Sequence, residues 1–306
     1  VNSIPATPVV ITADAVQGNY SGALVYVNDL EGKITKINMT NLSGNFSFNP
    51  TSGIVSQGAS NQNIQMFDQY TFFDLEATTV RTSSTNSNNR YMYHSMDAGI
   101  GSTTGNLWLF GATGDYLNLS DTGIIDPENN VKNVIFGIKD YYFPFFGQAS
   151  TSTGNTIDTL QECKNMTGDT NSCDAKTKRG WYINLSGGYK VTAEPTFANG
   201  VAYYPIFAPV RNNVSCGSGD AYVCGIEAEC GQNISSELDQ NNSSSFAARD
   251  CFKVGTGVLS KVVVFGSNLY ANISDESDNQ NKTDIVVINA IDRSTYDFRN
   301  SWRENF

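Results

Sequence analysis

The densest set of possible metal ligands in the chain lies at residues 275–284, in the segment DESDNQNKTD. Carboxylate and amide oxygens spaced along a short loop can converge on a calcium ion. The segment has no glycine at its turn, and Lys282 would oppose a cation, so a solvated turn between two strands is the simpler interpretation. The candidate ligands are Asp275, Asp278, Asn279, Asn281 and Asp284.

Six cysteines lie in the second half of the chain, mostly in polar, Gly- and Asn-rich segments that are typical of loops. An even number of loop cysteines favours disulfides and therefore an oxidising compartment. A metal site is the weaker interpretation, because the sequence contains no CxxC pair and only one histidine. We expect Cys163 and Cys173 to close one loop, whereas the other four cysteines allow three pairings. These four are Cys216, Cys224, Cys230 and Cys251.

Asn-x-Ser/Thr sequons are unusually dense and indicate a surface protein that carries glycans, although about half of them would arise by chance in a chain so rich in Asn. Only Asn241 has an acidic residue, Asp239, two positions before it. The candidate acceptors are Asn19, Asn38, Asn41, Asn45, Asn118, Asn165, Asn184, Asn213, Asn233, Asn241, Asn242, Asn272 and Asn281.

The residue pattern favours a non-enzymatic protein. A Ser-His-Asp triad would have to use His94, which we expect on a strand in a structural role, and no GxSxG elbow is present. Adjacent cysteines, which quinoprotein propellers use, are absent from the sequence. A glycosidase needs two converging carboxylates, but acidic pairs occur in any acidic chain. The pairs considered come from Asp68, Asp74, Glu76 and Asp97.

The chain has 306 residues and a net charge of −11, with 16% charged and 11% aromatic residues. An acidic chain repels phosphate backbones, so we expect no nucleic-acid partner. No apolar run reaches the roughly 20 residues of a membrane helix, and we expect no membrane span. The first residues show no signal-peptide pattern, so the chain is expected to be a processed or partial piece of a longer protein.

Short apolar runs between Gly-, Asn- and Asp-rich turns predict an all-β fold with no sustained helical period. The apparent repeat of roughly 50 to 90 residues is typical of β-propeller blades with decorated loops, and a β-sandwich is the main rival. We expect the aromatic block 141–146 to pack in the core or at a blade edge. Polar insertions are expected near 41–62, 147–179 and 227–250. The expected strands lie at 8–12, 23–27 and 33–39, then 90–94, 106–110 and 133–140, then within 179–223, and finally at 258–265, 268–272 and 285–290.

Six short segments follow one another along nearly the whole chain as a recognisable set. They are 25–34 (VYVNDLEGKI), 110–117 (FGATGDYL), 136–140 (FGIKD), 180–185 (GWYINL), 215–219 (SCGSG) and 301–304 (SWRE). In this order they resemble motifs of the C-terminal domain of the PilC/PilY family, the type IV pilus tip-associated biogenesis factors and adhesins.

This resemblance implies a modified seven-bladed β-propeller, of which residues 1–306 would form the C-terminal blades as one partial domain. It implies export through the periplasm to the cell surface and a place at the pilus tip. The implied role is in pilus assembly, retraction control and adhesion. Implied partners are minor pilins, host or abiotic surfaces or glycans, and the remainder of the protein's own propeller.

The resemblance also implies a calcium loop between the strands at 9–11 and 24–26. In the matching residues 14–22 only Asp14 is a carboxylate, so the family's calcium pattern is degenerate here. Calcium is the one cofactor that the sequence suggests. Two further functions stay open: a secreted propeller enzyme, either a quinoprotein or a glycan-active one, and a glycosylated structural component of a cell-surface filament or coat.

Overall fold

The fold is described from a computed structural model for residues 3–12, 22–40, 44–49, 54–57, 63–64, 66–76, 90–119, 132–147, 155–163, 178–185, 188–209, 219–238, 251–274 and 285–291. Within these ranges the chain is all-β, as the sequence predicts. The helices described are two short 3-10 turns, η1 (Ile157–Thr159) and η3 (Ser235–Glu237). None of the described helices is long and apolar enough to cross a membrane.

The described strands form four main sheets and one small sheet. Sheet 1 consists of β1 (Val9–Thr12), β2 (Ala23–Asn28), β3 (Lys33–Asn38) and β7 (Gln69–Asp74), paired in that order. Sheet 2 consists of β8 (Asp97–Ile100), β9 (Leu107–Ala112), β10 (Val134–Asp140), β12 (Gly180–Asn184) and β11 (Gln161–Glu162). Sheet 3 consists of β15 (Val201–Pro209), β16 (Gly219–Glu227) and β17 (Phe252–Thr256), with β13 (Lys190–Val191) and β14 (Thr196–Ala198) both paired to β15. Sheet 4 consists of β20 (Asn268–Ser274), paired to β18 (Val258–Leu259), β19 (Val263–Phe265) and β21 (Ile285–Asn289).

Three apolar cores join the four main sheets in chain order. Side chains alternate between the two faces of a strand, and both faces of sheets 2 and 3 are buried. On β9, Leu107 and Leu109 pack toward sheet 1, whereas Trp108 and Phe110 pack toward sheet 3. Strands buried on both faces have continuous apolar sequences. This explains why NLWLF and VAYYPIF show no polar alternation.

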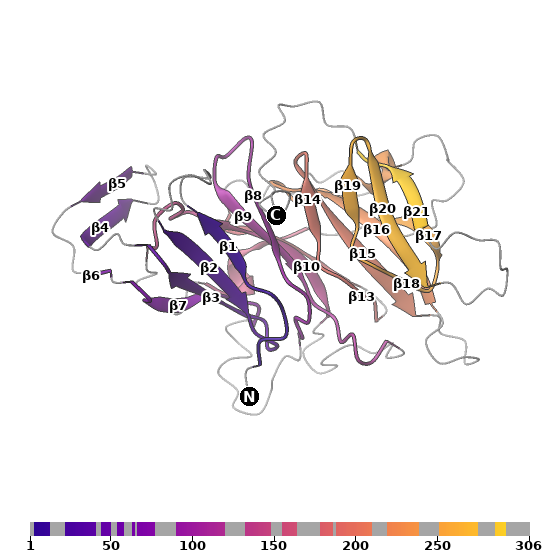
Figure 1. The fold of residues 1–306 in the computed structure, drawn as a ribbon, viewed down its shortest axis with the longest axis horizontal. Helices are drawn as coiled ribbons and strands as arrows, with labels where there is room; N and C mark the ends of the chain where they lie inside the picture. The colour runs from indigo at the N-terminus through magenta and orange to yellow at the C-terminus, as the bar shows by residue number, and fades with distance from the viewer. Residues whose placement is uncertain are drawn as a thin grey trace.

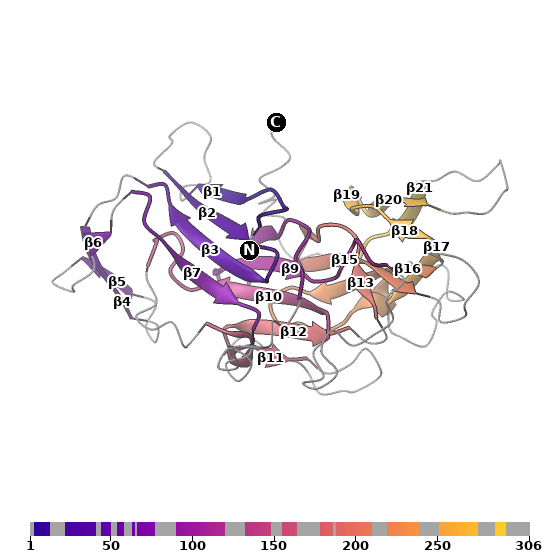
Figure 2. The same cartoon turned by 90° about the horizontal axis from the view of Figure 1, so that it is seen from below.

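Sheets 2, 3 and 4 contact one another through β14 of sheet 3, which contacts both β8 of sheet 2 and β19 of sheet 4. The backbone N–H of Phe197 donates to Asp97 Oδ2 over 2.8 Å, and the Thr196 hydroxyl donates to the Val262 carbonyl over 2.5 Å. Figures 1 and 2 show the four sheets following one another through the molecule. Mainly antiparallel sheets that follow one another in chain order and contact one another in this way are arranged as in a β-propeller. No sheet is closed within the described ranges, so the propeller and its blade number stay a prediction.

Three of the predicted strand assignments are wrong. The predicted strand 258–265 is two strands, β18 and β19, which both pair with β20. Residues 90–94 are not a strand, because their backbone groups bond to turns: Met92 N–H donates to Leu30, and the Tyr91 carbonyl accepts from Gly114. The first strand of sheet 2 is instead Asp97–Ile100. Residues 180–184, expected in the third unit, belong to sheet 2, where β12 pairs with β10.

The three predicted insertions carry structure of their own. Residues 41–62 contain β4 (Gly44–Asn49) and β5 (Ile54–Gln57), which with β6 (Asn63–Ile64) form the small sheet. In 147–179, Ile157 and Leu160 are buried in the core between sheets 1 and 2. In 227–250, Ile234 and Leu238 are buried in the core between sheets 3 and 4. Segments that are polar overall therefore contain a few apolar residues that pack against the sheets, and the average composition does not reveal them.

Candidate functional site

An open groove of about 830 Å³ lies where the turn after β9 approaches the start of sheet 3 and the end of sheet 4. The lining residues are apolar, hydroxyl-bearing or amide-bearing, and none of those in the described part of the chain is charged. They are Tyr116, Thr192, Val258, Leu259, Ser260, Asn272, Ile273, Ser274 and Ile285. Such a lining suits a neutral ligand that offers both hydroxyl groups and an apolar face.

The hydroxyl groups of the groove are held by the backbone around them. Thr192 donates to the Leu259 carbonyl over 2.8 Å, and Ser274 Oγ accepts from Val258 N–H over 2.9 Å. Ser260 Oγ accepts from Asn272 N–H over 2.9 Å. Ser260 and Ser274 also donate to the Lys261 and Val258 carbonyls over 3.0 and 3.4 Å. The three hydroxyl protons are therefore engaged within the chain, and the capacity left for a ligand is to accept hydrogen bonds. Ser274 and Ile285 also stand at the two ends of the predicted calcium segment 275–284, which lies outside the described residues.

His94 stands behind Tyr116 at the edge of this groove. The two rings meet edge to face with centroids 5.5 Å apart. Burial lowers the pKa of His94 below its ordinary value, and the charge of Glu194 opposes that shift. Nε2 of His94 is buried and has no hydrogen-bond partner within the described residues. His94 therefore packs against Tyr116, and it does not lie on the strand that the sequence predicts.

A second cluster of polar groups is fully buried between sheets 1 and 2. Lys36 Nζ lies 2.5 Å from Asp140 Oδ2 and donates to the Phe145 carbonyl over 3.0 Å. The Tyr26 hydroxyl donates to the same Oδ2 over 2.5 Å, and Tyr142 N–H donates to Oδ1 over 2.9 Å. Burial lowers the pKa of Lys36 despite the nearby Asp140 carboxylate. Burial, followed by the charge of Asp140, raises the pKa of Tyr26 well above its ordinary value.

The aromatic block 141–146 packs around this cluster, as the sequence predicts. Lys36 Nζ lies 5.8 Å from the ring centre of Phe146, and 5.7 and 6.0 Å from those of Tyr26 and Phe72. Phe146 is buried, and Phe143 packs partly buried on the same core. The block therefore holds the interface between two sheets and is not an exposed patch.

The acidic residues considered for glycoside hydrolysis have structural roles where their contacts are described. Asp74 Oδ1 accepts from the backbone N–H of Glu76 over 3.0 Å. Asp97 Oδ2 accepts from Phe197 N–H in the adjoining sheet. Of the residues proposed for calcium, Asp14 and all those in 275–284 lie outside the described residues. No group of three or more His, Cys, Asp or Glu side chains that could hold a metal occurs among the residues that the structure describes.

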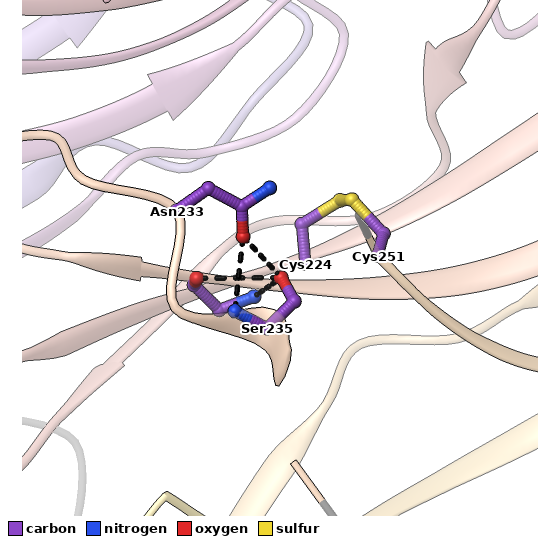
Figure 3. The surroundings of a disulfide bond; sticks show 5 residues. Cys224, Asn233, Ser235 and Cys251 are labelled. Carbon is purple, nitrogen blue, oxygen red and sulfur yellow. Dashed lines mark hydrogen bonds between the residues drawn. A yellow bond between two sulfur atoms is a disulfide. The ribbon is translucent and has the colours of Figure 1, made fainter. Parts of the chain in front are cut away.

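A disulfide joins Cys224 on β16 to Cys251 at the start of β17, with a Cα–Cα distance of 4.6 Å. This is one of the three pairings that the sequence left open. Figure 3 shows the bond beside Asn233 and Ser235, where the Ser235 hydroxyl donates to Asn233 Oδ1 over 2.6 Å. Cys163 is also disulfide-bonded, with a partner outside the described ranges, so its predicted bond to Cys173 stays a prediction.

The described sequons differ in how accessible their amide groups are. Asn38 is fully buried, and its Oδ1 accepts from the backbone N–H and the hydroxyl of Thr40. Asn184 Nδ2 donates to Glu162 over 2.9 Å, and Asn233 is half-buried. Asn118 and Asn272 are exposed. Because Asn272 also lines the groove, Asn118 is the described position best suited to carry a glycan.

Two buried charged residues, Lys36 and Glu229, were not identified from the sequence. Lys36 lies at an inward position of the alternating strand 33–39, between Ile34 and Asn38, and an inward lysine is itself a signal. Glu229 is buried and accepts from the N–H groups of Thr103 and Thr104 over 2.7 and 2.8 Å. It ties the first turn of sheet 2 to the end of β16. Its polar, Gly-rich sequence context gave no such signal.

The described residues define an all-β protein built of successive antiparallel sheets. No protein-family model and no curated protein matches the sequence. Among solved structures, the chain is similar to the Pseudomonas aeruginosa PilY1 C-terminal domain, with 13% sequence identity and a TM-score of 0.45. The match covers 87% of this chain and 56% of that chain, so this chain spans about half of that domain's length.

Proposed function

We propose that this chain is a non-enzymatic, type IV pilus-associated surface protein whose stacked sheets form a rigid binding platform. The observation that supports the proposal is that the segments resembling the PilC/PilY family contact one another in the folded chain. Four of the six segments lie mainly within the described residues: 25–34, 110–117, 136–140 and 180–185. They fall on β2, β9, β10 and β12 and the turns beside them.

The contacts between these segments pair complementary residues. Gly137 lies opposite Trp181 in the β10–β12 register, and a Cβ on Gly137 would stand 2.7 Å from the indole Cε2. A Cβ on Gly111 would stand 2.5 Å from Cζ of Phe136. Tyr26 donates to Asp140 across the interface of sheets 1 and 2. In the first two pairs an aromatic ring fits only because its neighbour is glycine, and in the third a buried hydroxyl donor needs the carboxylate as acceptor. The motifs therefore depend on one another for packing and hydrogen bonding.

In this proposal the sheets hold loops and the groove in fixed positions at the pilus tip. Minor pilins are the proposed anchoring partners, and the groove lined by Tyr116, Ser260 and Asn272 is the proposed contact for neutral surface glycans. Aromatic rings beside hydroxyl and amide groups suit the mixed apolar and polar faces of a sugar. Assembly, retraction control and adhesion are the proposed consequences of this binding. Calcium at 275–284 stays a prediction.

Gene deletion in the native host tests the pilus role. We expect fewer surface pili and weaker surface attachment, both restored by the wild-type gene. Immunogold labelling of the complemented strain should place the protein at pilus tips. Labelling along the whole filament would support the coat or filament component instead, and unchanged piliation with label away from pili would refute the proposal.

A groove variant separates adhesion from assembly. Tyr116→Ala removes an aromatic ring from the groove lining, whereas Leu117→Ala alters the next residue, which is exposed and does not line the groove. We expect Tyr116→Ala to reduce attachment to glycan-coated surfaces several-fold with normal piliation, because ring stacking supplies much of the contact with a sugar. Equal attachment by the two variants would exclude the groove as the adhesive site.

A further inference from the structure

Lys36 and Asp140 form the most deeply buried ion pair described in the chain. They are 104 positions apart in sequence, on β3 and β10, and both side chains are 0% exposed. Their Nζ and Oδ2 atoms are 2.5 Å apart, inside a wall of the Tyr26, Phe72 and Phe146 rings. An amine and a carboxyl group held together in a buried site are the two reactants of an amide.

We propose that Lys36 and Asp140 are joined by an intramolecular amide bond, which ties sheet 1 covalently to sheet 2. The product is an isopeptide cross-link between the Lys36 side-chain nitrogen and Cγ of Asp140. No oxidant or cofactor is needed, because the reaction is a condensation that releases one water molecule. The proposal is independent of the pilus role, since it depends only on this interface.

The hydrogen bonds assign a separate role to each carboxyl oxygen. In the proposed reaction one proton passes from the Lys36 ammonium to the Asp140 carboxylate, and the neutral amine then attacks Cγ, forming the C–N bond and a tetrahedral intermediate. Oδ1 stays as the amide oxygen, held by Tyr142 N–H at 2.9 Å, which also stabilises negative charge on it during attack. Oδ2 leaves as water: Tyr26 donates a proton to it and takes one back from the attacking nitrogen, so the phenol is regenerated.

Burial works against the charged form of Lys36, whose side chain is fully buried among aromatic rings. A buried ion pair has a large desolvation cost, and the transfer of one proton from the Lys36 ammonium to the Asp140 carboxylate removes both charges. Burial lowers the pKa of Lys36, and the positive charge of Arg179 lowers it further. Burial and the charge of Asp140 raise the pKa of Tyr26, so the phenol keeps its proton and its hydrogen bond to Oδ2 before the reaction. Desolvation is a general way in which proteins make a lysine nucleophilic.

A second ion pair in the chain, Lys261–Glu194, is as short but partly exposed and serves as a control for the effect of burial. Lys261 Nζ and Glu194 Oε1 are also 2.5 Å apart, but their side chains are 30% and 22% exposed. Water stabilises both ions at such a site and holds them as a salt bridge. We therefore expect the cross-link at Lys36–Asp140 and none at Lys261–Glu194. Since both N–O distances are 2.5 Å, this difference would show that burial, and not proximity alone, is required for the reaction.

Mass spectrometry of the folded full chain, after reduction and alkylation, tests the proposal. The intact mass should be lower than the sequence mass by one water, about 18 Da. Trypsin does not cleave after an acylated lysine, so residues 34–81 should appear as one peptide joined to residues 140–164. A full sequence mass with cleavage after Lys36, giving separate peptides 37–81 and 140–164, would overturn the proposal.

Two variants test the chemistry. Lys36→Arg keeps a buried cation but lacks the amine, so we expect the full sequence mass. Tyr26→Phe keeps Lys36 and Asp140 in place but lacks the proton donor, and we expect at least a tenfold smaller cross-linked fraction at a fixed time after refolding. Wild-type cross-linking by Tyr26→Phe would overturn the assigned role of Tyr26. Since the wild-type mass alone decides whether the bond exists, a variant that fails to fold leaves that decision intact.

Discussion

His94 is the only histidine in the chain, so its titration can be followed without interference. Burial lowers its pKa below the ordinary 6.5, because a half-buried imidazole with an unpartnered Nε2 resists protonation. We predict a single imidazole titration in the folded protein with a pKa below 6.5, measured by proton NMR. A value at or above 6.5 would show that Glu194 or solvent outweighs the effect of burial.

The same shift sets the direction of a pH effect on stability. A histidine with a lowered folded pKa binds protons more readily in the unfolded state, so its contribution is complete above about pH 6.5 and declines as the pH falls through that value. Replacing His94 by Gln should therefore flatten the dependence of the unfolding free energy on pH between about 7.5 and 5.5. Carboxylates titrate in both proteins and cancel in the comparison.

At the scale of elements, Gly99 on β8 sets how closely sheets 2 and 3 approach. A Cβ at Gly99 would stand 2.1 Å from Cε1 of Phe197 on β14, and Phe197 also stacks on Phe110 with centroids 5.0 Å apart. We predict that Gly99→Ala costs about 1–3 kcal/mol of unfolding free energy through overpacking. A denaturant titration measures this loss.

Phe197→Leu provides the matched partner for Gly99→Ala. Because the smaller side chain makes room for the added methyl group, the double variant should be more stable than the sum of the single losses predicts, by about 0.5–3 kcal/mol. Strict additivity would mean that β8 and β14 are not in the close contact described here.

The disulfide Cys224–Cys251 closes a loop with a sequence separation of 27 residues between β16 and β17. In the chain-entropy account, a loop of this length stabilises the fold by about 3–4 kcal/mol. Replacing both cysteines by Ala should lower the unfolding free energy by that amount. The comparison is made in an oxidising buffer, so that the disulfide at Cys163 is intact in both the wild type and the variant. An unchanged free energy would show that the loop is already restrained in the unfolded chain.

The positions of strands could be predicted from the sequence more readily than the pairing of strands into sheets. Runs such as ALVYV, KITKINM and NVIFGIKD are apolar, rich in β-branched residues and bounded by turn residues, and they are the strands β2, β3 and β10. Partnership is a long-range property: β12 joins sheet 2 because Trp181 fits over Gly137, which no local pattern reveals. Asp97–Ile100 was missed because DAGI carries little strand propensity of its own.

The groove and the buried cluster were not predictable as sites. The groove combines residues from the turn after β9, the start of sheet 3 and both sides of β20, so its lining depends on how the sheets pack. Ser, Thr and Asn at those positions are ordinary turn residues in sequence. Asp140 lay in a recognised motif, but its partner Lys36 is 104 residues away and was identifiable only through the alternation of its own strand.

At the scale of the whole molecule, sheet 4 has an exposed apolar face in the part of the chain that the structure describes. Each of the three cores joins consecutive sheets, and Leu269, Ile273 and Ile288 turn toward sheet 3. The alternate positions on β19 and β21 point away from that core and are 52–75% exposed; they are Val263, Phe265, Ile285 and Val287. An apolar face on a sheet is a docking or association surface, since water contact with it is unfavourable.

We therefore predict that the isolated 306-residue chain self-associates through this face as its concentration rises. Light scattering coupled to size exclusion should show an average mass that increases with concentration, and Phe265→Lys combined with Val287→Lys should return it to the monomer value by placing charges on the face. Phe67→Lys is the matched control, because Phe67 is similarly exposed, at 63%, but lies in the turn before β7 of sheet 1. A chain that stays monomeric at every concentration would show that the four side chains are tolerated as ordinary exposed apolar surface.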